Sequence, residues 1–329
     1  MDTVDKIKAG DVRSIARLIT QVENRDPDAV EVLKQVYSFC GNAVLVGITG
    51  PPGVGKSCLV AAVVKKFREQ NMSVGILAVD PSSPFSGGAL LGDRVRMIDL
   101  SADKEIFMRS LASRGALGGL SAAVNDAVDI LDASGKDVII IETVGVGQGE
   151  IDIAGLAHTV VLVLMPGYGD TMQAMKAGVM EIADILVVNK ADKPGADTAV
   201  ADLANVQHSL ETNDNWHSPV IKTCALSGEG VDELVSAIFE HREYLKKHNV
   251  TAGNSERRKK QFLDILTQQI RDEFKKDMKI DPSLRNWVKQ IENLELPPYT
   301  AAEQVIKMIK QARAKVNELY SAGLFIDSF

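Results

Sequence analysis

Residues 50–57 read Gly-Pro-Pro-Gly-Val-Gly-Lys-Ser, which fits the phosphate-binding pattern G-x-x-x-x-G-K-[ST] at every fixed position. Before this stretch, residues 43–49 form a short apolar, β-branched-rich run that predicts a buried strand. After it, residues 58–70 carry apolar side chains at helical spacing. A strand–loop–helix unit of this kind presents backbone N–H groups and a helix N-terminus to phosphate oxygens. The alternative is a glycine-rich turn that matches by chance, and the flanking strand and helix argue against it.

The side chains of this loop predict how a nucleotide is held. Lys56 is expected to reach the β- and γ-phosphates, and the Ser57 hydroxyl is expected to bind Mg²⁺. Nucleotide contacts are expected from Gly50, Pro51, Pro52, Gly53, Val54, Gly55, Lys56, Ser57 and Cys58.

The composition of the 329-residue chain narrows the class of protein. The hydrophobic content is 45%, enough for a sizeable core, and the net charge of −7 argues against a general binder of nucleic acids or anionic membranes. The three cysteines have neither C-x-x-C spacing nor a nearby histidine, so no zinc site or disulfide framework is expected. No run of about 18 apolar residues occurs. We therefore expect a soluble, cytoplasmic protein.

Strand and helix patterns alternate through the middle of the chain. The expected strands are residues 43–49, 74–79, 138–141, 160–164, 185–188 and 220–223. Alternation of this kind predicts an α/β fold, a mostly parallel sheet flanked by helices. Ligands then bind beyond the carboxyl ends of the strands.

The patterns divide the chain into three expected parts: an N-terminal helical arm at residues 1–42, a nucleotide domain at 43–248 and a C-terminal helical extension at 249–329. In the arm, Asp28 could cap a second helix. The last helix carries a long apolar stripe that either packs on the parent domain or mediates self-association. The basic cluster at residues 257–260 is interpreted as a solvated helix face, with a partner site as the alternative.

Two acidic residues stand at expected strand ends. Asp80 follows the second strand, and Glu142 follows the run at 138–141. Mg²⁺ prefers oxygen ligands and usually takes one or two carboxylates. Both acids are therefore candidates for the metal site, and the alternative for each is a helix cap.

Residues 189–192 read Asn-Lys-Ala-Asp after the expected strand at 185–188, which matches the guanine-reading pattern N-K-x-D. The Asp192 carboxylate can accept two hydrogen bonds from guanine, whereas adenine offers no such donor pair. Lys190 would lie along the base, and Asn189 would tie the loops together. After the last strand, Ala225 could offer its backbone N–H to the guanine oxygen, beside Leu226 and Ser227.

Glycine-rich stretches at residues 82–96 and 145–150 predict loops that respond to the γ-phosphate. A third stretch, at residues 166–170, is expected to open the helix that contains Lys176. No arginine is clearly placed to act within the chain on the transition state. Slow intrinsic hydrolysis accelerated by a partner is therefore expected.

Four stretches together resemble the MeaB/ArgK/MMAA family of P-loop GTPases. They are G-P-P-G-V-G-K-S at residues 50–57, V-D-P-S-S-P-F-S-G-G-A-L-L-G-D-R at 79–94, E-T-V-G-V-G-Q-G-E at 142–150 and N-K-A-D at 189–192. The second and third are highly specific to that family, and the similarity covers roughly residues 44–240. The resemblance implies a SIMIBI-type G domain that binds GTP or GDP with Mg²⁺. It also implies a homodimer formed through the C-terminal extension, and a chaperone that assists adenosylcobalamin loading and protection of an acyl-CoA mutase, usually methylmalonyl-CoA mutase.

The resemblance also implies roles for residues in the loops. Asp80, Asp93 and Glu142 match the magnesium-site acids, with Ser57 beside them. Gln148 lies in the stretch that matches switch II and, with Lys56, is expected to be catalytic. Lys176 matches a lysine linked to partner-stimulated hydrolysis, and its alternative is a solvated helix lysine. Gly149 and Tyr168 depart from the family pattern and leave open which mutase is the client.

Three other functions are less consistent with the sequence. A nickel-insertion maturation GTPase would need a His-rich or Cys-rich tract, which five scattered histidines and three cysteines do not supply. A kinase linked to basic amino-acid transport would need a phosphoacceptor that the sequence does not reveal. A non-catalytic GTP-binding module is disfavoured by the intact Lys56, Ser57, Asp80 and Glu142.

Overall fold

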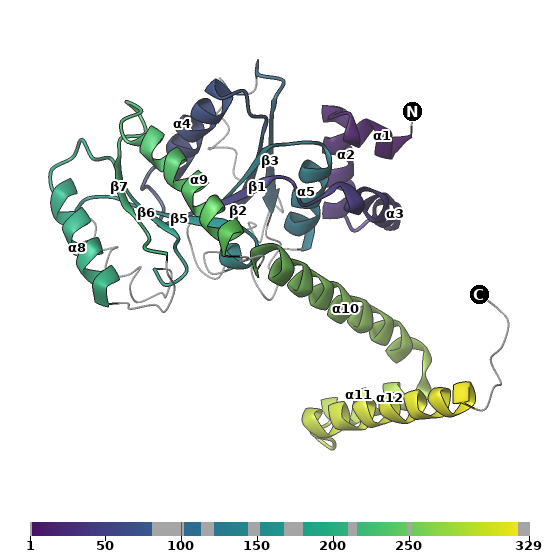
Figure 1. Cartoon of the computed structure of the whole chain (residues 1–329). Helices are drawn as coiled ribbons and strands as arrows, with labels where there is room; N and C mark the ends of the chain where they lie inside the picture. Colours follow the sequence, from purple (N-terminus) through teal and green to yellow (C-terminus); the bar gives the residue numbers. More distant parts are fainter. Residues whose placement is uncertain are drawn as a thin grey trace. The chain divides into compact units, whose positions relative to one another are not determined.

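The structure is a computed structural model that describes residues 2–80, 100, 102–112, 122–143, 152–167, 180–209, 216–248 and 252–321. The chain divides into two compact units, Met1–Phe262 and Leu263–Phe329. The first unit contains the sheet (Figure 1). In the second unit, all the secondary structure of the described residues is helical.

The first unit is built on a seven-stranded parallel sheet, with strand order β3-β2-β4-β1-β5-β6-β7. The strands are β1 Val44–Thr49, β2 Val74–Asp80, β3 Ile106–Ala112, β4 Val138–Thr143, β5 Thr159–Leu164, β6 Ile185–Asn189 and β7 Val220–Thr223. The central strands β1, β4 and β5 are buried at every position, as expected for a sheet covered on both faces. The predicted α/β fold is confirmed.

Helices cover both faces of the sheet. Apolar residues of α4 (Lys56–Glu69) and α9 (Val231–Lys247) share a core with one set of strand side chains. The opposite face packs against α1 (Thr3–Lys8), α2 (Val12–Glu23), α3 (Pro27–Val36) and α5 (Ala122–Ala133). Figure 1 shows these two groups of helices on either side of the strands. The described residues of this unit also form η1 (Tyr37–Phe39), η3 (Ile153–Gly155) and α8 (Ala196–Ser209).

The strand β3 was not predicted. It pairs in parallel with β2 at the edge of the sheet, from Val74↔Ile106 to Asp80↔Ala112. Its sequence, Ile-Phe-Met-Arg-Ser-Leu-Ala, contains one β-branched residue and two central polar residues. A strand with a single paired edge tolerates such a composition, and a search for buried, β-branched runs misses it.

The N-terminal arm forms three helices, where two were expected. The cap of α3 is Asp26, which accepts a hydrogen bond from the backbone N–H of Asp28 at 3.0 Å. The expectation that Asp28 is the cap is wrong by two residues, because Pro27 takes the first helical position, where its missing N–H costs nothing.

The basic cluster is not simply a solvated face. Arg257 is only 2% exposed, and its Nη2 donates to Asp129 Oδ1 of α5 at 2.7 Å. Arg258 lies over the ring of Tyr37, and Lys260 Nζ is 3.4 Å from Asp152 Oδ1. The start of α10 (Ala252–Ile280) therefore docks on the first unit through charged side chains.

The free energy of unfolding is expected to depend on pH through Asp126, which lies beside the docked start of α10. Burial and the neighbouring Asp129 carboxylate raise the pKa of Asp126 from 3.8 to about 7, partly opposed by a hydrogen bond from Gln261 and the charge of Arg257. The folded chain thus keeps a proton that the unfolded chain has released between these values. Stability should fall by up to about 4 kcal/mol as pH rises through this range.

Asp126→Asn is therefore expected to stabilise the protein at pH 8 and to change little near pH 4, measured by chemical denaturation at both pH values. Asp103→Asn is the opposing control, because the hydrogen bond from Arg68 lowers the pKa of Asp103 and its loss should destabilise. Equal effects of Asp126→Asn at both pH values would contradict the assignment.

The second unit contains the rest of α10, α11 (Pro282–Glu292) and α12 (Pro298–Ser321). Asp281 caps α11 by accepting from the backbone N–H of Ser283 at 2.7 Å. Large apolar side chains are exposed on these helices in the single chain: Leu263, Ile265, Leu266, Ile270, Tyr299, Ile306 and Met308.

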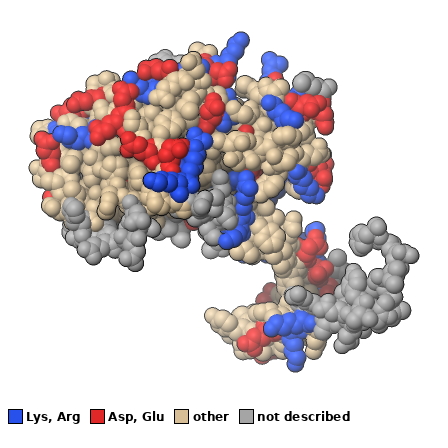
Figure 2. All heavy atoms as spheres, in the orientation of Figure 1, with Lys and Arg blue, Asp and Glu red and all other residues tan. Residues whose placement is uncertain are grey.

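Acidic and basic side chains lie beside one another on the face shown in Figure 2. Within the part of the chain that the structure describes, no helix combines the length and apolarity that crossing a membrane requires.

Candidate functional site

The glycine-rich loop connects the end of β1 to the start of α4, as predicted. Its three glycines, Gly50, Gly53 and Gly55, have positive φ angles that other residues rarely adopt, and at two of them a side chain would also collide. Gly55, the N-cap of α4, has φ +95°, and a Cβ there would lie 2.6 Å from Asn189 Nδ2. Gly50 has φ +140°, and a Cβ there would collide with the carbonyl oxygen of Val163. The loop is therefore confined between β5 and the end of β6.

The side chains of Lys56 and Ser57, at the start of α4, each bond a neighbouring segment. Lys56 is 6% exposed, and its Nζ donates to the carbonyl oxygens of Gly50 at 2.7 Å and Pro51 at 2.9 Å. The ammonium group thus lies inside the curve of the loop. Ser57 Oγ donates to Glu142 Oε1 at 2.7 Å, which joins the start of α4 to β4.

Asn189 ties three segments together at the end of β6. Its Nδ2 donates to the carbonyl oxygen of Val54 at 2.9 Å. Its Oδ1 accepts from Thr223 Oγ1 and from the backbone N–H of Ala225, each at 3.1 Å. The proposed base-binding residues are therefore linked directly to the glycine-rich loop.

Lys190 leaves the strand with φ +58°, an uncommon conformation for a non-glycine residue. Its Nζ donates to the carbonyl oxygen of Gly53 at 2.5 Å and lies 3.3 Å from Met165 Sδ. This stretches the aliphatic part of the side chain beside the loop, where it can cover one face of a base.

The Asp192 carboxylate is exposed, and its Oδ1 accepts from the Cys224 thiol at 3.4 Å. The Ala225 N–H, expected to serve the guanine oxygen, donates to Asn189 Oδ1 in this structure, so it must share or exchange that bond to contact a base. Leu226 is 89% exposed beside it, and Ser227 Oγ donates to the Cys224 carbonyl oxygen at 3.3 Å.

Sequence reasoning missed the side chains of Thr223 and Cys224. Both donate hydrogen bonds to residues of the predicted N-K-x-D motif: Thr223 to Asn189, and Cys224 to Asp192. Their place directly at the end of β7, the strand beside β6, was the available signal.

Among the predicted metal-site residues, the structure brings Ser57 and Glu142 together. The side chain of Asp80, at the end of β2, and residue Asp93 lie outside what the structure describes, as do Gln148 and Lys176. A hydroxyl and a carboxylate oxygen 2.7 Å apart are hard oxygen donors of the kind that Mg²⁺ prefers, so the described pair fits this ion.

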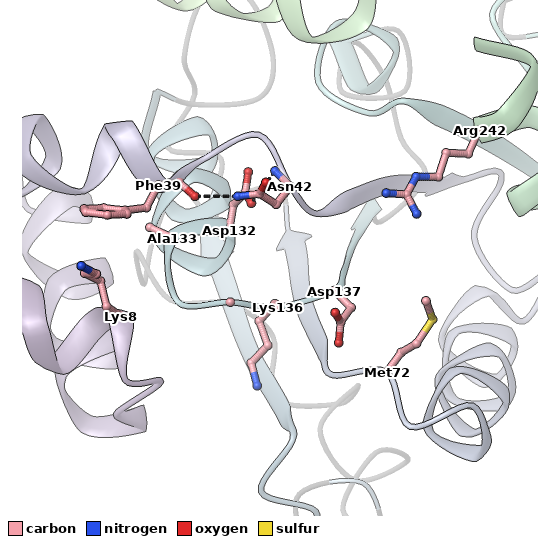
Figure 3. Close-up of a pocket in the computed structure, with 10 residues that line it drawn as sticks. Lys8, Phe39, Asn42, Met72, Asp132, Ala133, Lys136, Asp137 and Arg242 are labelled. Carbon is pink, nitrogen blue, oxygen red and sulfur yellow. Dashed lines mark hydrogen bonds between the residues drawn. The ribbon is translucent and has the colours of Figure 1, made fainter. Parts of the chain in front are cut away.

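A pocket of about 270 Å³ lies near the amino ends of the strands, at the other end of the sheet from the glycine-rich loop (Figure 3). Asn42 and Asp137, which line it, precede β1 and β4, so it faces away from the glycine-rich loop. The carboxylate of Asp132 in this pocket accepts from the backbone N–H groups of residues 41–43, and Asp137 accepts from Ser73. These acids have a structural role: they hold the chain where it enters the strands.

Comparison with known proteins identifies the family. A family model described as methylmalonyl Co-A mutase-associated GTPase MeaB matches residues 15–283. The chain belongs to the MeaB family. The resemblance found in the sequence is confirmed, and the protein is a P-loop GTPase of this family.

Individual relatives of this chain match over almost their full length. A protein of Pyrococcus horikoshii is 46% identical over 314 residues, covering 94% of this chain and 98% of the relative. The GTPase ArgK of Escherichia coli is 31% identical over 322 residues, covering 94% and 96%. A crystal structure of a LAO/AO transport system kinase has a TM-score of 0.68 at 26% identity and covers 94% of this chain and 96% of that one.

Proposed function

We propose that this MeaB-family GTPase is a chaperone that assists adenosylcobalamin loading and protection of an acyl-CoA mutase, methylmalonyl-CoA mutase or a close relative. The family description, which names association with methylmalonyl-CoA mutase, supports the client. The observation that carries the nucleotide part is the linkage of the glycine-rich loop to Asn189 and Lys190 through the carbonyl oxygens of Val54 and Gly53. This linkage supports the proposal that the loop binds phosphate and the residues after β6 read the base at the same end of the sheet.

We propose the following roles for the individual residues. Lys56 binds the β- and γ-phosphates, and the backbone N–H groups of the loop and of the α4 N-terminus surround their oxygens. Asp192 reads guanine, with Lys190 along the base and Ala225, Leu226 and Ser227 at its edge. Bound Mg²⁺ would neutralise phosphate charge, held by Ser57 and Glu142 together with Asp80 and Asp93. Gln148 and Lys176 are the proposed catalytic residues that act with Lys56.

We further propose a homodimer formed through the C-terminal helices. Leu263, Leu266 and Ile270 follow one another at intervals of three and four along α10 and are 56%, 39% and 55% exposed. Contiguous apolar side chains of this kind on a single chain are typical of an association surface. Adenosylcobalamin enters this proposal only through the client enzyme.

The deciding experiment measures GTP turnover with and without candidate clients. Mutases acting on methylmalonyl-, isobutyryl-, ethylmalonyl- and hydroxyacyl-CoA would each be added at saturating concentration. We expect one of them to accelerate phosphate release by at least about tenfold, because positioning of loops by a partner is a general route to faster hydrolysis. The Lys56→Ala variant provides the background rate.

The alternative is a kinase, the activity named for the protein in the similar crystal structure. GTP labelled on the γ-phosphate distinguishes the two: a GTPase chaperone releases inorganic phosphate, whereas a kinase transfers the label to protein. No acceleration by any mutase, or label found on protein, would contradict the chaperone proposal.

A further inference from the structure

Two buried threonines join β1 to β4 directly below the nucleotide site. Thr143 Oγ1 donates to Thr49 Oγ1 at 2.9 Å. Thr49 is fully buried and Thr143 is 4% exposed. Neither residue was singled out by its sequence, because a threonine at the end of a strand is ordinary.

This bond lies where the backbone pairing of the two strands stops. The β1–β4 ladder runs from Val44↔Val138 to Ile48↔Glu142. Thr49 still pairs with Leu162 on its other side, and Thr143 with Val79. The hydroxyl bond therefore adds one further link between β1 and β4 after their ladder has ended.

The link lies next in the chain to the glycine-rich loop and to Glu142 of the proposed metal site. Thr49 is followed by Gly50, where the glycine-rich loop begins, and Thr143 follows Glu142. Alternation along the strands puts the Glu142 side chain on the face covered by α4, where it meets Ser57. The two threonines lie on the other face, beyond Leu45, Ile139 and Ile141. Any influence of the two hydroxyls on the Glu142 carboxylate must therefore pass through the backbone.

We propose that the Thr49–Thr143 hydrogen bond is a positioning device that sets the separation between the Glu142 carboxylate and the Ser57 hydroxyl, and thereby the affinity of the nucleotide complex for Mg²⁺. This inference rests on the proposed metal site. Glu142 is the last residue of β4 in the ladder with β1, through its pairing with Ile48, and the hydroxyl bond lies directly beyond this pair. Without the bond, the end of the ladder is less restrained, and the Glu142 carboxylate can shift relative to the start of α4. Supporting contacts of this kind commonly change metal affinity by about 10- to 100-fold.

The variants must separate a shift of the Glu142 carboxylate from the loss of stability that a buried, unpaired hydroxyl causes. Thr143→Val leaves the Thr49 hydroxyl without its partner in an apolar layer, which destabilises the fold by itself. The double variant Thr49→Val/Thr143→Val removes both hydroxyls with nearly unchanged shape and leaves no orphan. Thr143→Ser keeps the hydroxyl. Thr159→Val is the matched control, since Thr159 is a fully buried strand residue whose hydroxyl bonds His241, far along the chain.

The readout is the Mg²⁺ concentration that half-maximally strengthens binding of a fluorescent GDP, together with thermal unfolding of each variant. We expect this concentration to rise about tenfold in Thr143→Val and in the double variant. We expect wild-type values for Thr143→Ser and Thr159→Val, and unchanged GDP affinity in all variants when a chelator removes Mg²⁺.

Two results would overturn the inference. An unchanged Mg²⁺ response in the double variant would show that the hydroxyl bond only stabilises the fold. GDP binding by the wild-type protein that does not respond to Mg²⁺ at all would remove the proposed metal site as well, so the two failures are distinguishable.

Discussion

Lys56→Ala is expected to weaken binding of both GTP and GDP by at least about 100-fold. The Nζ atom lies within the curve of the loop, bonded to the carbonyl oxygens of Gly50 and Pro51. A phosphate can replace these neutral acceptors with charged ones, and hydrogen bonds to charged groups contribute about 1.5–3 kcal/mol each. Alanine removes the only side-chain cation of the loop itself, so the loss affects both nucleotides.

The matched control is Lys65→Ala, because Lys65 lies on the same helix but is exposed. Titration of a fluorescent guanine nucleotide into both variants gives the two dissociation constants, and circular dichroism reports whether α4 is intact. Wild-type affinity in a folded Lys56→Ala protein would remove the phosphate-loop assignment.

The parts of the fold that the sequence predicts well are those with one dominant local signal. Buried β-branched runs gave six of the strands, and the loop at residues 50–57 placed β1 and α4 because its glycine pattern requires that context. The order of parallel strands around β1 then brings residues after β6 and β7 to the same edge. Asn189 could therefore be assigned a linking role before its contacts with Val54 and Thr223 were seen.

The parts that could not be predicted depend on tertiary contacts. Arg257 looks like one member of a solvated basic run, and only the Asp129 carboxylate on α5 explains its burial. The edge strand β3 has no strong pattern of its own and forms because β2 offers a free ladder. The Thr49–Thr143 bond depends on the relative register of β1 and β4, which local sequence does not encode.

Asp192→Asn is expected to exchange a preference for guanine for a preference for xanthine. Guanine offers the ring N–H and the exocyclic amine to a carboxylate, whereas xanthine has an oxygen in place of that amine. An amide supplies a donor for this oxygen and an acceptor for the remaining N–H. Sites built to bond a donor reject analogues without it by about 10⁴-fold or more, so GTP affinity should fall by at least about 100-fold.

Competition of GDP and XDP against a fluorescent nucleotide measures the exchange directly. The conservative change keeps the shape of the side chain and its acceptor for the Cys224 thiol, so a general collapse of the loop is not expected. Asp202→Asn, at an exposed position of α8, controls for the loss of one negative charge. If Asp192→Asn still prefers GDP as the wild type does, Asp192 does not read the base, and the specificity of this GTPase must reside in Lys190, Ala225 or the segments beside them.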